Sequence, residues 1–146
     1  MKHLIIESAD FERLSKFTVH SVVNKLSQSM GFFVKDLVIN FVSETKITSI
    51  NKEYLKHDYS TDIITFNYSE RLNTLEGEIY ISYSNALDNA EKFGVKYSNE
   101  ILRLIIHGIL HMLGHNDIKT SEKNEMRLLE DKYLAELNSL EKNLLR

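Results

Sequence analysis

The longest apolar stretch of the chain, ILRLIIHGILHML at residues 101–113, is the feature that most limits the fold. It is shorter than the roughly 20 residues that a membrane-spanning helix needs, and it carries Arg103 and two histidines. Ser98 can cap a helix ahead of it, and Gly114 suits the left-handed residue that ends a helix. The stretch therefore predicts a helix over residues 98–113 within a soluble globular protein.

Length and composition predict one domain with a sizeable core. The chain has 146 residues, 42% of them hydrophobic and 27% charged, and it contains no repeat, low-complexity tract or Pro/Gly-rich linker. We therefore expect residues 1–146 to form a single domain. The N-terminus reaches acidic residues after only three consecutive apolar positions, which is too few for a signal peptide. We expect a cytoplasmic protein that does not contact a membrane.

Two further properties of the composition restrict the chemistry. Cysteine is absent, so neither disulfides nor thiolates can hold the fold, and a bound metal must use His, Asp, Glu or water as ligands. The formal net charge of −3 gives no overall attraction to nucleic acid. A nucleic-acid role would therefore need a local basic surface or a specific site.

The pattern of apolar residues predicts a mixed α+β fold. Segments rich in β-branched and aromatic residues predict four strands, over residues 3–8, 36–42, 61–66 and 77–82. Helical spacing predicts five helices, over residues 11–30, 44–54, 85–93, 98–113 and 120–140, with Asp10 and Ser43 as caps of the first two. We expect a single mixed four-stranded sheet covered by about five helices. The last helix carries a stripe that we assign to the core rather than to a docked partner, made of Met126, Leu129, Tyr133, Leu137 and Leu140.

The predicted helix over residues 98–113 carries two histidines at metal-binding spacing. His107 and His111 are four residues apart, which puts both imidazoles on one face of a helix. This is the two-histidine half of the zincin-like HExxH motif, in which the glutamate is the general base of a metalloprotease. Gly108 stands at the glutamate position, so a peptidase is disfavoured. A glycine inside a helix costs about 1 kcal/mol relative to alanine, so Gly108 predicts close approach of another backbone or of a substrate.

Two residues are candidates for a third metal ligand. His115 would share the histidine face if the helix continued past Gly114. If Gly114 ends the helix and turns the chain, Asp117 can fold back to meet His107 and His111. Either choice leaves a fourth coordination position open to water, as catalytic zinc sites do.

The segment HGILHMLGHND, residues 107–117, resembles the HGxLHLxGYDH signature of the YbeY family of bacterial endoribonucleases, which are also called rRNA maturation factors. Upstream, INKEYLKHDYSTDIITF at residues 50–66 is similar to the family's LNxxYRxxDxPTDVLSF, and GEIYIS at residues 77–82 is similar to GDIxIS. The last helix, with Met126 and Glu130, is also similar. The blocks occur in family order through about the last two thirds of the chain, which makes them far more specific than a bare HxxxH.

The resemblance implies a metal-dependent endoribonuclease that cleaves single-stranded rRNA. It implies a role in maturation of the 16S rRNA 3′ end and in ribosome quality control, with the small ribosomal subunit as partner. By position it implies one Zn²⁺ per chain held by His107, His111 and Asp117, where Asp117 replaces the family's usual third histidine and His115 occupies the family's tyrosine position. A carboxylate ligand also broadens the expected metal preference towards harder ions such as Mn²⁺ or Fe²⁺, with zinc still the first expectation.

The sequence departs from the family where a phosphate would be bound. The family's arginine is replaced by Leu55, so Lys56 or Arg103 is expected to stabilise phosphate charge, and Arg103 lies one helical turn before His107. Leu55 also supports an alternative, a metal-stabilised ribosome-associated binding factor with little or no cleavage activity. The remaining candidates are Asp58 and Asp62, to orient a ligand or water or else to serve as turn and cap residues, and Tyr54, Phe66 and Tyr80, to stack bases or else to pack in the core.

Overall fold

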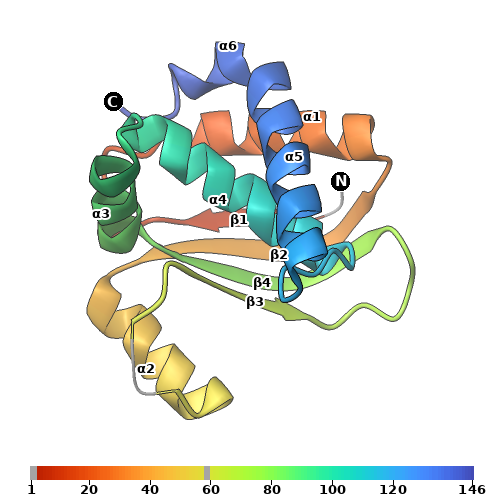
Figure 1. Ribbon diagram of the computed structural model, residues 1–146, viewed down its shortest axis with the longest axis horizontal. Helices are drawn as coiled ribbons and strands as arrows, with labels where there is room; N and C mark the ends of the chain where they lie inside the picture. The colour runs from red at the N-terminus through yellow and green to blue at the C-terminus, as the bar shows by residue number, and fades with distance from the viewer. Residues whose placement is uncertain (1–2, 58–59) are drawn as a thin grey trace.

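A four-stranded mixed sheet forms the centre of the computed structural model, which describes residues 3–57 and 60–146 (Figure 1). The strands lie in the order β1-β2-β4-β3. β1 pairs with β2 and β2 pairs with β4 in parallel, whereas β3 and β4 are antiparallel. The prediction of a single mixed four-stranded sheet is confirmed. The strand bounds are β1 Leu4–Glu7, β2 Phe33–Val42, β3 Ile63–Asn67 and β4 Thr74–Ser82.

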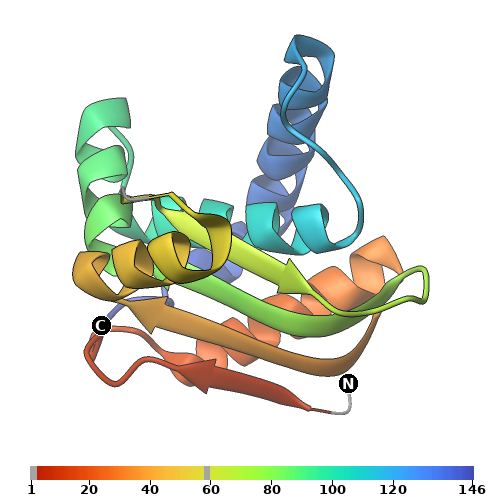
Figure 2. The same ribbon diagram turned by 90° about the horizontal axis from the view of Figure 1, so that it is seen from below.

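Helices lie on both sides of this sheet. Figure 1 shows α1, α4 and α5 on one side and α2 on the other, and in Figure 2 α2 lies in front of the strands. The described residues contain six helices instead of about five, because the predicted last helix is divided at Leu137 into α5 and the single turn α6. The helix bounds are α1 Lys16–Met30, α2 Glu44–Leu55, α3 Tyr83–Phe93, α4 Tyr97–Met112, α5 Thr120–Glu136 and α6 Asn138–Glu141.

The strands β2 and β4 each begin three residues earlier than the sequence predicted. Their first residues pair in parallel, Phe33 with Thr74 and Val34 with Leu75. Val34 and Leu75 are fully buried, while Lys35 and Glu76 form a partly exposed ion pair at 3.5 Å. The polar residues at the start of each strand made these segments look unlike a strand in the sequence. They are compatible with one because one face of the strand is buried and the other faces water.

The first helix begins at Lys16, so the prediction that Asp10 caps it is wrong. Ser15 is the N-cap, and its side chain accepts a hydrogen bond from the backbone N–H of Thr18 at 3.2 Å. Phe11 lies in the preceding loop, where its ring stacks on Tyr83 with centroids 5.1 Å apart. Phe17, which helical spacing assigned to the apolar face, is 81% exposed. The helix therefore starts at the Ser15 cap, and the residues assigned to its first turns lie in a loop that places Phe11 against a ring far along the sequence.

Two other helix boundaries differ from the prediction. α4 starts at Tyr97 with Lys96 at the N-cap, so Ser98 does not cap it. The Ser98 hydroxyl instead donates to a carboxylate oxygen of Glu141 at 3.2 Å, which ties α4 to α6. The stripe assigned to the core from the last helix does pack there: Met126, Tyr133 and Leu137 are buried, and Leu129 and Leu140 pack against the core.

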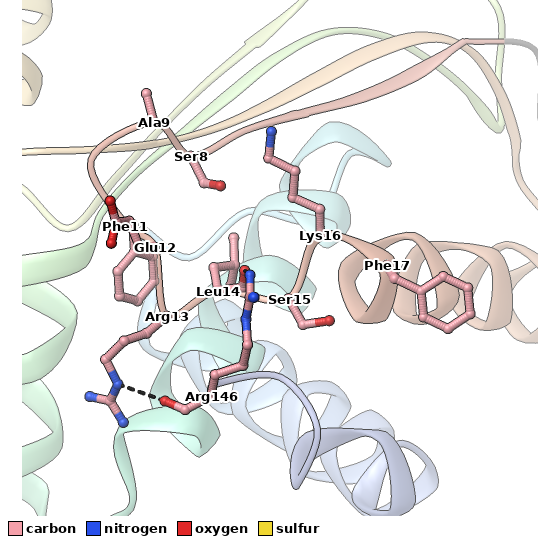
Figure 3. Close-up of a pocket in the computed structure, with 10 residues that line it drawn as sticks. All are labelled: Ser8, Ala9, Phe11, Glu12, Arg13, Leu14, Ser15, Lys16, Phe17 and Arg146. Atoms are coloured by element: carbon pink, nitrogen blue, oxygen red, sulfur yellow. Dashed lines mark hydrogen bonds between the residues drawn. The ribbon is translucent and has the colours of Figure 1, made fainter.

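The last residues of the chain pack against the loop that precedes α1. The backbone N–H of Ser15 donates to the carbonyl of Leu144 at 2.8 Å, and that of Arg146 donates to the carbonyl of Arg13 at 2.7 Å. Figure 3 shows the surface hollow beside this junction, of about 950 Å³, in which Arg13 Nε donates to the backbone carbonyl of Arg146 at 3.0 Å. The hollow is lined by residues 8–9, 11–17 and Arg146, so it contains none of the candidate metal ligands.

Helix α4 is buried on nearly every side. Leu102, Ile105, Ile106 and Ile109 have no exposed surface. A β-carbon at Gly108 would lie 3.0–3.2 Å from side-chain carbons of Ile63 and Ile79, so the predicted close approach is made by side chains of β3 and β4 rather than by a backbone. In the described part of the chain, no helix is both long enough and apolar enough to cross a membrane.

Substitution of Gly77 tests the closest packing in the sheet. A β-carbon there would overlap the backbone carbonyl of Phe66, which precedes Asn67, the residue that pairs with Gly77 on β3. We expect Gly77→Ala to lower the free energy of unfolding by about 3 kcal/mol, the upper end of the usual cost of overpacking. Chemical denaturation measures the loss.

Gly108→Ala is the matched comparison, because the nearest atoms to its β-carbon would be methyl groups of isoleucine side chains rather than backbone. The gain in helix propensity, about 1 kcal/mol, offsets much of that contact. Equal destabilisation by the two substitutions would contradict this account of Gly77.

Candidate metal centre

His107 and His111 lie on the exposed side of an otherwise buried helix. Their rings come from successive turns of α4, with centroids 4.9 Å apart and planes inclined at 62°. The His107 side chain is 14% exposed and that of His111 is 31% exposed. The rigid packing of α4 against β3 and β4 therefore fixes both backbones while one edge of the imidazole pair faces solvent.

Asp117 reaches the histidines because the chain turns at Gly114. Gly114 has a φ of 100°, and the N–H of His115 donates back to the carbonyl of Leu110 at 3.0 Å, as at the ends of many helices. The carboxylate of Asp117 then lies 3.4 Å from Nε2 of His107 and 3.2 Å from Nε2 of His111. The turn that the sequence indicated at Gly114 is present.

His107, His111 and Asp117 together have the arrangement of a metal site. One ligand atom from each residue lies within 4.8 Å of the ligand atoms of the other two. Within residues 3–57 and 60–146, this is the one group of at least three His, Asp or Glu side chains close enough to share an ion. His115 does not belong to it; it lines a separate hollow of about 170 Å³ beside Glu122 and Glu125. The geometry therefore favours Asp117 over His115 as third ligand.

Glu130 of α5 holds the other nitrogen of His107. Its carboxylate oxygen lies 2.6 Å from Nδ1, and Glu130 is only 6% exposed. With Nδ1–H donated to the carboxylate, the lone pair lies on Nε2, the nitrogen that faces Asp117. Sequence reasoning gave Glu130 no role at the site. The sequence did contain one indication of this role: Glu130 is a carboxylate one helical turn after Met126, on the side of the helix that is buried in the core.

Arg103 is bound by two carboxylates. Its Nε and Nη2 donate to the two oxygens of Glu100 at 2.8 and 2.6 Å, and its Nη1 donates to Glu130 at 3.2 Å. Burial by itself lowers the pKa of Arg103, but the hydrogen bonds and charges of Glu100 and Glu130 outweigh it, so the net pKa is raised. Arg103 therefore stays cationic, and its side chain is 26% exposed.

Asp62 joins the same set of polar contacts at one remove. The side-chain amide of Asn89 donates to the carboxylate of Asp62 at 2.9 Å and to Glu100 at 3.2 Å. Asp62 also accepts the backbone N–H of Ser82 through its carbonyl at 2.9 Å, next to the start of β3. Asp58, the other carboxylate considered from the sequence, lies outside the described residues.

The aromatic candidates lie on the opposite face of the sheet. Side chains alternate along β3, so Ile63 faces Gly108 of α4, whereas Ile64 and Phe66 face α2. Phe66 makes edge contacts with Tyr54 and Tyr80, at centroid distances of 5.7 and 6.1 Å. These three rings pack in and around a small core beneath α2.

Tyr80 and Tyr54 differ in exposure within this aromatic group. Burial, together with a hydrogen bond to Glu78, raises the pKa of Tyr80 to about 12, so its phenol stays protonated at neutral pH. Tyr54 is 61% exposed. Tyr54 therefore offers an open ring, while Tyr80 serves mainly to complete the packing.

Leu55 and Lys56 lie at the C-terminal end of α2. Lys56 is the C-cap, in the left-handed conformation with φ 60°, and it is exposed. Leu55 is 42% exposed and borders a hollow of about 300 Å³ with Thr61 and Ile63. Within the described residues neither belongs to the group of three candidate ligands, and the hollow that Leu55 borders contains none of those ligands.

The donor set fits a divalent ion. Two imidazoles and one carboxylate form the ligand set, which leaves room for water or a substrate oxygen. Among the residues joined by ion pairs, Asp117, Glu130 and Glu100 contribute three negative charges and Arg103 one positive charge, an excess of two negative charges when the imidazoles are neutral. Buried charges are normally paired or neutralised by a metal, and a divalent cation balances this excess.

Comparisons with known proteins identify the family to which the chain is similar. A family model described as Endoribonuclease YbeY matches residues 2–138. Curated relatives with the same description include a Bacteroides thetaiotaomicron protein, 42% identical over 113 residues, which are 77% of this chain and 82% of the relative. Another, from Parabacteroides distasonis, is 38% identical over 129 residues, 88% of this chain and 90% of the relative.

A solved structure also matches. The solution structure of a Thermotoga maritima protein aligns with a TM-score of 0.62 at 23% identity, over 94% of this chain and 92% of the other. At this level of identity the match shows a common fold.

Metal analysis of two single variants distinguishes the candidates for the third ligand. We expect Asp117→Ala to lose most of the bound divalent ion, because it removes the only carboxylate in the three-residue group. His115→Ala is the control and should keep wild-type metal content. Loss of metal in His115→Ala with retention in Asp117→Ala would reverse the assignment.

Proposed function

The chain belongs to the endoribonuclease YbeY family, and we propose that it is a metal-dependent endoribonuclease that cleaves single-stranded RNA. The observation that carries the proposal is the convergence of His107, His111 and Asp117 on one point at the end of α4. Family membership supplies the substrate class, and the open imidazole pair supplies a place for the reaction. Within this family the proposed substrate is rRNA, with maturation of the 16S rRNA 3′ end and ribosome quality control as the process.

The ligand residues divide the work at the site. His107, His111 and Asp117 would hold a divalent ion, which would supply Lewis acidity toward a water molecule and a phosphate oxygen. His107 and His111 present Nε2 from a rigid helix, and Asp117 adds a negative charge from the turn that follows. Glu130 orients His107 through Nδ1. Gly108 leaves no carboxylate where a helical metalloprotease carries its general base, which supports a phosphodiester substrate over a peptide.

We propose one Zn²⁺ per chain as the resident ion. Two imidazoles and a carboxylate are a usual ligand set for catalytic zinc. The same set also accepts Mn²⁺ or Fe²⁺, because imidazole and carboxylate bind many first-row divalent metals. Metal analysis of protein purified without added metal identifies the ion.

A cation near the substrate phosphate completes the proposal. Arg103 and Lys56 are the two candidates from the sequence, and Arg103 already donates to two carboxylates. Lys56 adjoins Leu55, the position of the family's arginine, and its side chain is exposed. We therefore assign the phosphate contact to Lys56. The proposed partner is the RNA of the small ribosomal subunit, and the proposed location is the cytoplasm, where ribosomes are assembled.

Cleavage of a single-stranded RNA by the metal-loaded protein tests the proposed activity. We expect metal-dependent cleavage that is lost on chelation and falls by at least about 100-fold in His111→Ala, because the site no longer holds its ion. The matched control is His20→Ala, a histidine on α1 remote in sequence from the site, which should keep full activity. Intact RNA after incubation with fully loaded wild type would contradict the proposal.

The alternative function, a metal-stabilised binding factor, is supported by Leu55, which stands where the family has an arginine. Thermal unfolding with and without chelator separates the two functions. For either function we expect a lower melting temperature after metal removal, because a bound metal stabilises the folded state. The metal-free cluster would also keep its excess negative charge. A large melting shift together with no metal-dependent cleavage favours the binding factor; a shift together with cleavage favours the nuclease.

A further inference from the structure

We propose that Arg103 is a positioning residue for the metal ligand His107, acting through Glu130 as part of a buried Glu100–Arg103–Glu130 brace. The inference rests on the proposed metal site and assigns Arg103 a task different from binding phosphate. Its guanidinium lies between two carboxylates, one of which contacts a ligand histidine.

The contacts form a continuous series from α4 to α5 and back. Arg103 binds Glu100 through two parallel hydrogen bonds of 2.8 and 2.6 Å within the same helix. Its third donor reaches Oε1 of Glu130 on α5 at 3.2 Å, and Oε2 of the same carboxylate contacts Nδ1 of His107 at 2.6 Å. Each oxygen of Glu130 therefore has a different partner, which fixes the plane of the carboxylate and hence the hydrogen bond that it offers to the imidazole.

Burial makes the arginine necessary to this arrangement. Glu100 is 1% exposed and Glu130 is 6% exposed, so two carboxylates lie close together with little access to water. Like charges at a shared buried site repel each other, and a cation that contacts both carboxylates offsets that repulsion. Arg103 is the cation that contacts both. Its planar fork suits the bidentate contact with Glu100 and leaves a donor for Glu130.

The direction of these contacts separates positioning from phosphate binding. The two nitrogens of an imidazole point away from each other across the ring. Nε2 of His107 faces Asp117, and Nδ1 faces Glu130. Arg103 lies beyond Glu130 and so on the side of His107 opposite to the proposed metal. Its exposed edge borders a groove of about 450 Å³ with Phe93, Arg127 and Asp131, which contains none of the three proposed ligands.

Asn89 extends the brace to the sheet. Its side-chain amide joins Glu100 to Asp62, at 3.2 and 2.9 Å, so the carboxylate that holds Arg103 is itself fastened from α3. Four elements therefore meet in one polar series: the start of β3, α3, α4 and α5. This explains why a buried ion pair is retained beside the site although an apolar pair of similar volume would also fill the space.

Three proteins test the brace in a background where folding is protected. Arg103→Met alone would leave two buried carboxylates without a cation and is liable to unfold. We therefore compare Glu100→Gln, Glu100→Gln with Arg103→Met, and Glu100→Gln with Arg103→Lys. The matched control is Asp131→Asn, which removes one negative charge from α5 next to Glu130. The readouts are Zn²⁺ affinity by chelator competition, the visible spectrum of the Co²⁺-loaded protein and the melting temperature of the metal-free protein.

We expect the Met variant to bind Zn²⁺ about 10- to 100-fold more weakly than its Glu100→Gln background, the usual effect of losing a group that orients a metal ligand. Its Co²⁺ spectrum should change, because His107 loses its fixed orientation. The Lys variant should recover much of the affinity, since an ammonium can still donate to Glu130. Asp131→Asn should match wild type.

Two results would overturn the inference. Unchanged Zn²⁺ affinity and an unchanged Co²⁺ spectrum in the Met variant, with or without a lower melting temperature, would mean that Arg103 serves only to stabilise the fold. A wild-type protein that binds neither metal would instead refute the proposed metal site, and the inference with it. The wild-type titration thus separates failure of the brace from failure of the proposed function.

Discussion

The contact between α4 and the β3–β4 edge of the sheet is the one on which the site depends. Gly108 lets the isoleucines of β3 and β4 pack directly against the helix, and the surrounding residues of α4 are fully buried. The packing fixes the helix about its axis, so His107 and His111 must project from its remaining open face. A histidine pair on a loosely packed surface helix would lack this orientation, since its backbone could rotate and shift against the fold.

Beside this rigid helix, the two nitrogens of His107 and the two oxygens of Glu130 each have different partners. Nε2 of His107 faces the open site, and Nδ1 faces a buried carboxylate. The carboxylate has one oxygen on the histidine and one on Arg103. The excess of two negative charges in the ion-paired group is the electrostatic basis for the proposed divalent cation. Under that proposal metal binding also stabilises the fold, because the cation offsets the repulsion between the carboxylates.

The sequence predicted what depends on local pattern. The spacing of His107 and His111 and the turn at Gly114 follow from helix periodicity and glycine geometry, and the structure shows both. The same pattern left His115 and Asp117 as alternatives, and the structure brings Asp117 to the two histidines. The four strands also follow from their composition. What the sequence did not predict depends on contacts between distant segments.

Three features illustrate that limit. Phe11 leaves the first helix for a ring contact with Tyr83, and Ser98 gives up capping for a contact with Glu141. Glu130 meets His107 across 23 positions of sequence, and no periodicity of a single helix reveals such a partner. Helical spacing places Arg103 on the same side of α4 as the histidines. Its guanidinium is nevertheless held by Glu100 of the preceding turn and by Glu130 of α5, which the sequence alone did not reveal.

X-ray absorption at the zinc edge of the loaded wild-type protein tests the central claim most directly, because it reports the atoms around the ion without reference to activity. The account predicts two imidazole nitrogens at about 2.0–2.1 Å with oxygen from Asp117 and water completing four ligands. A shell with three imidazoles, which would require His115, or a shell of oxygen alone would contradict it.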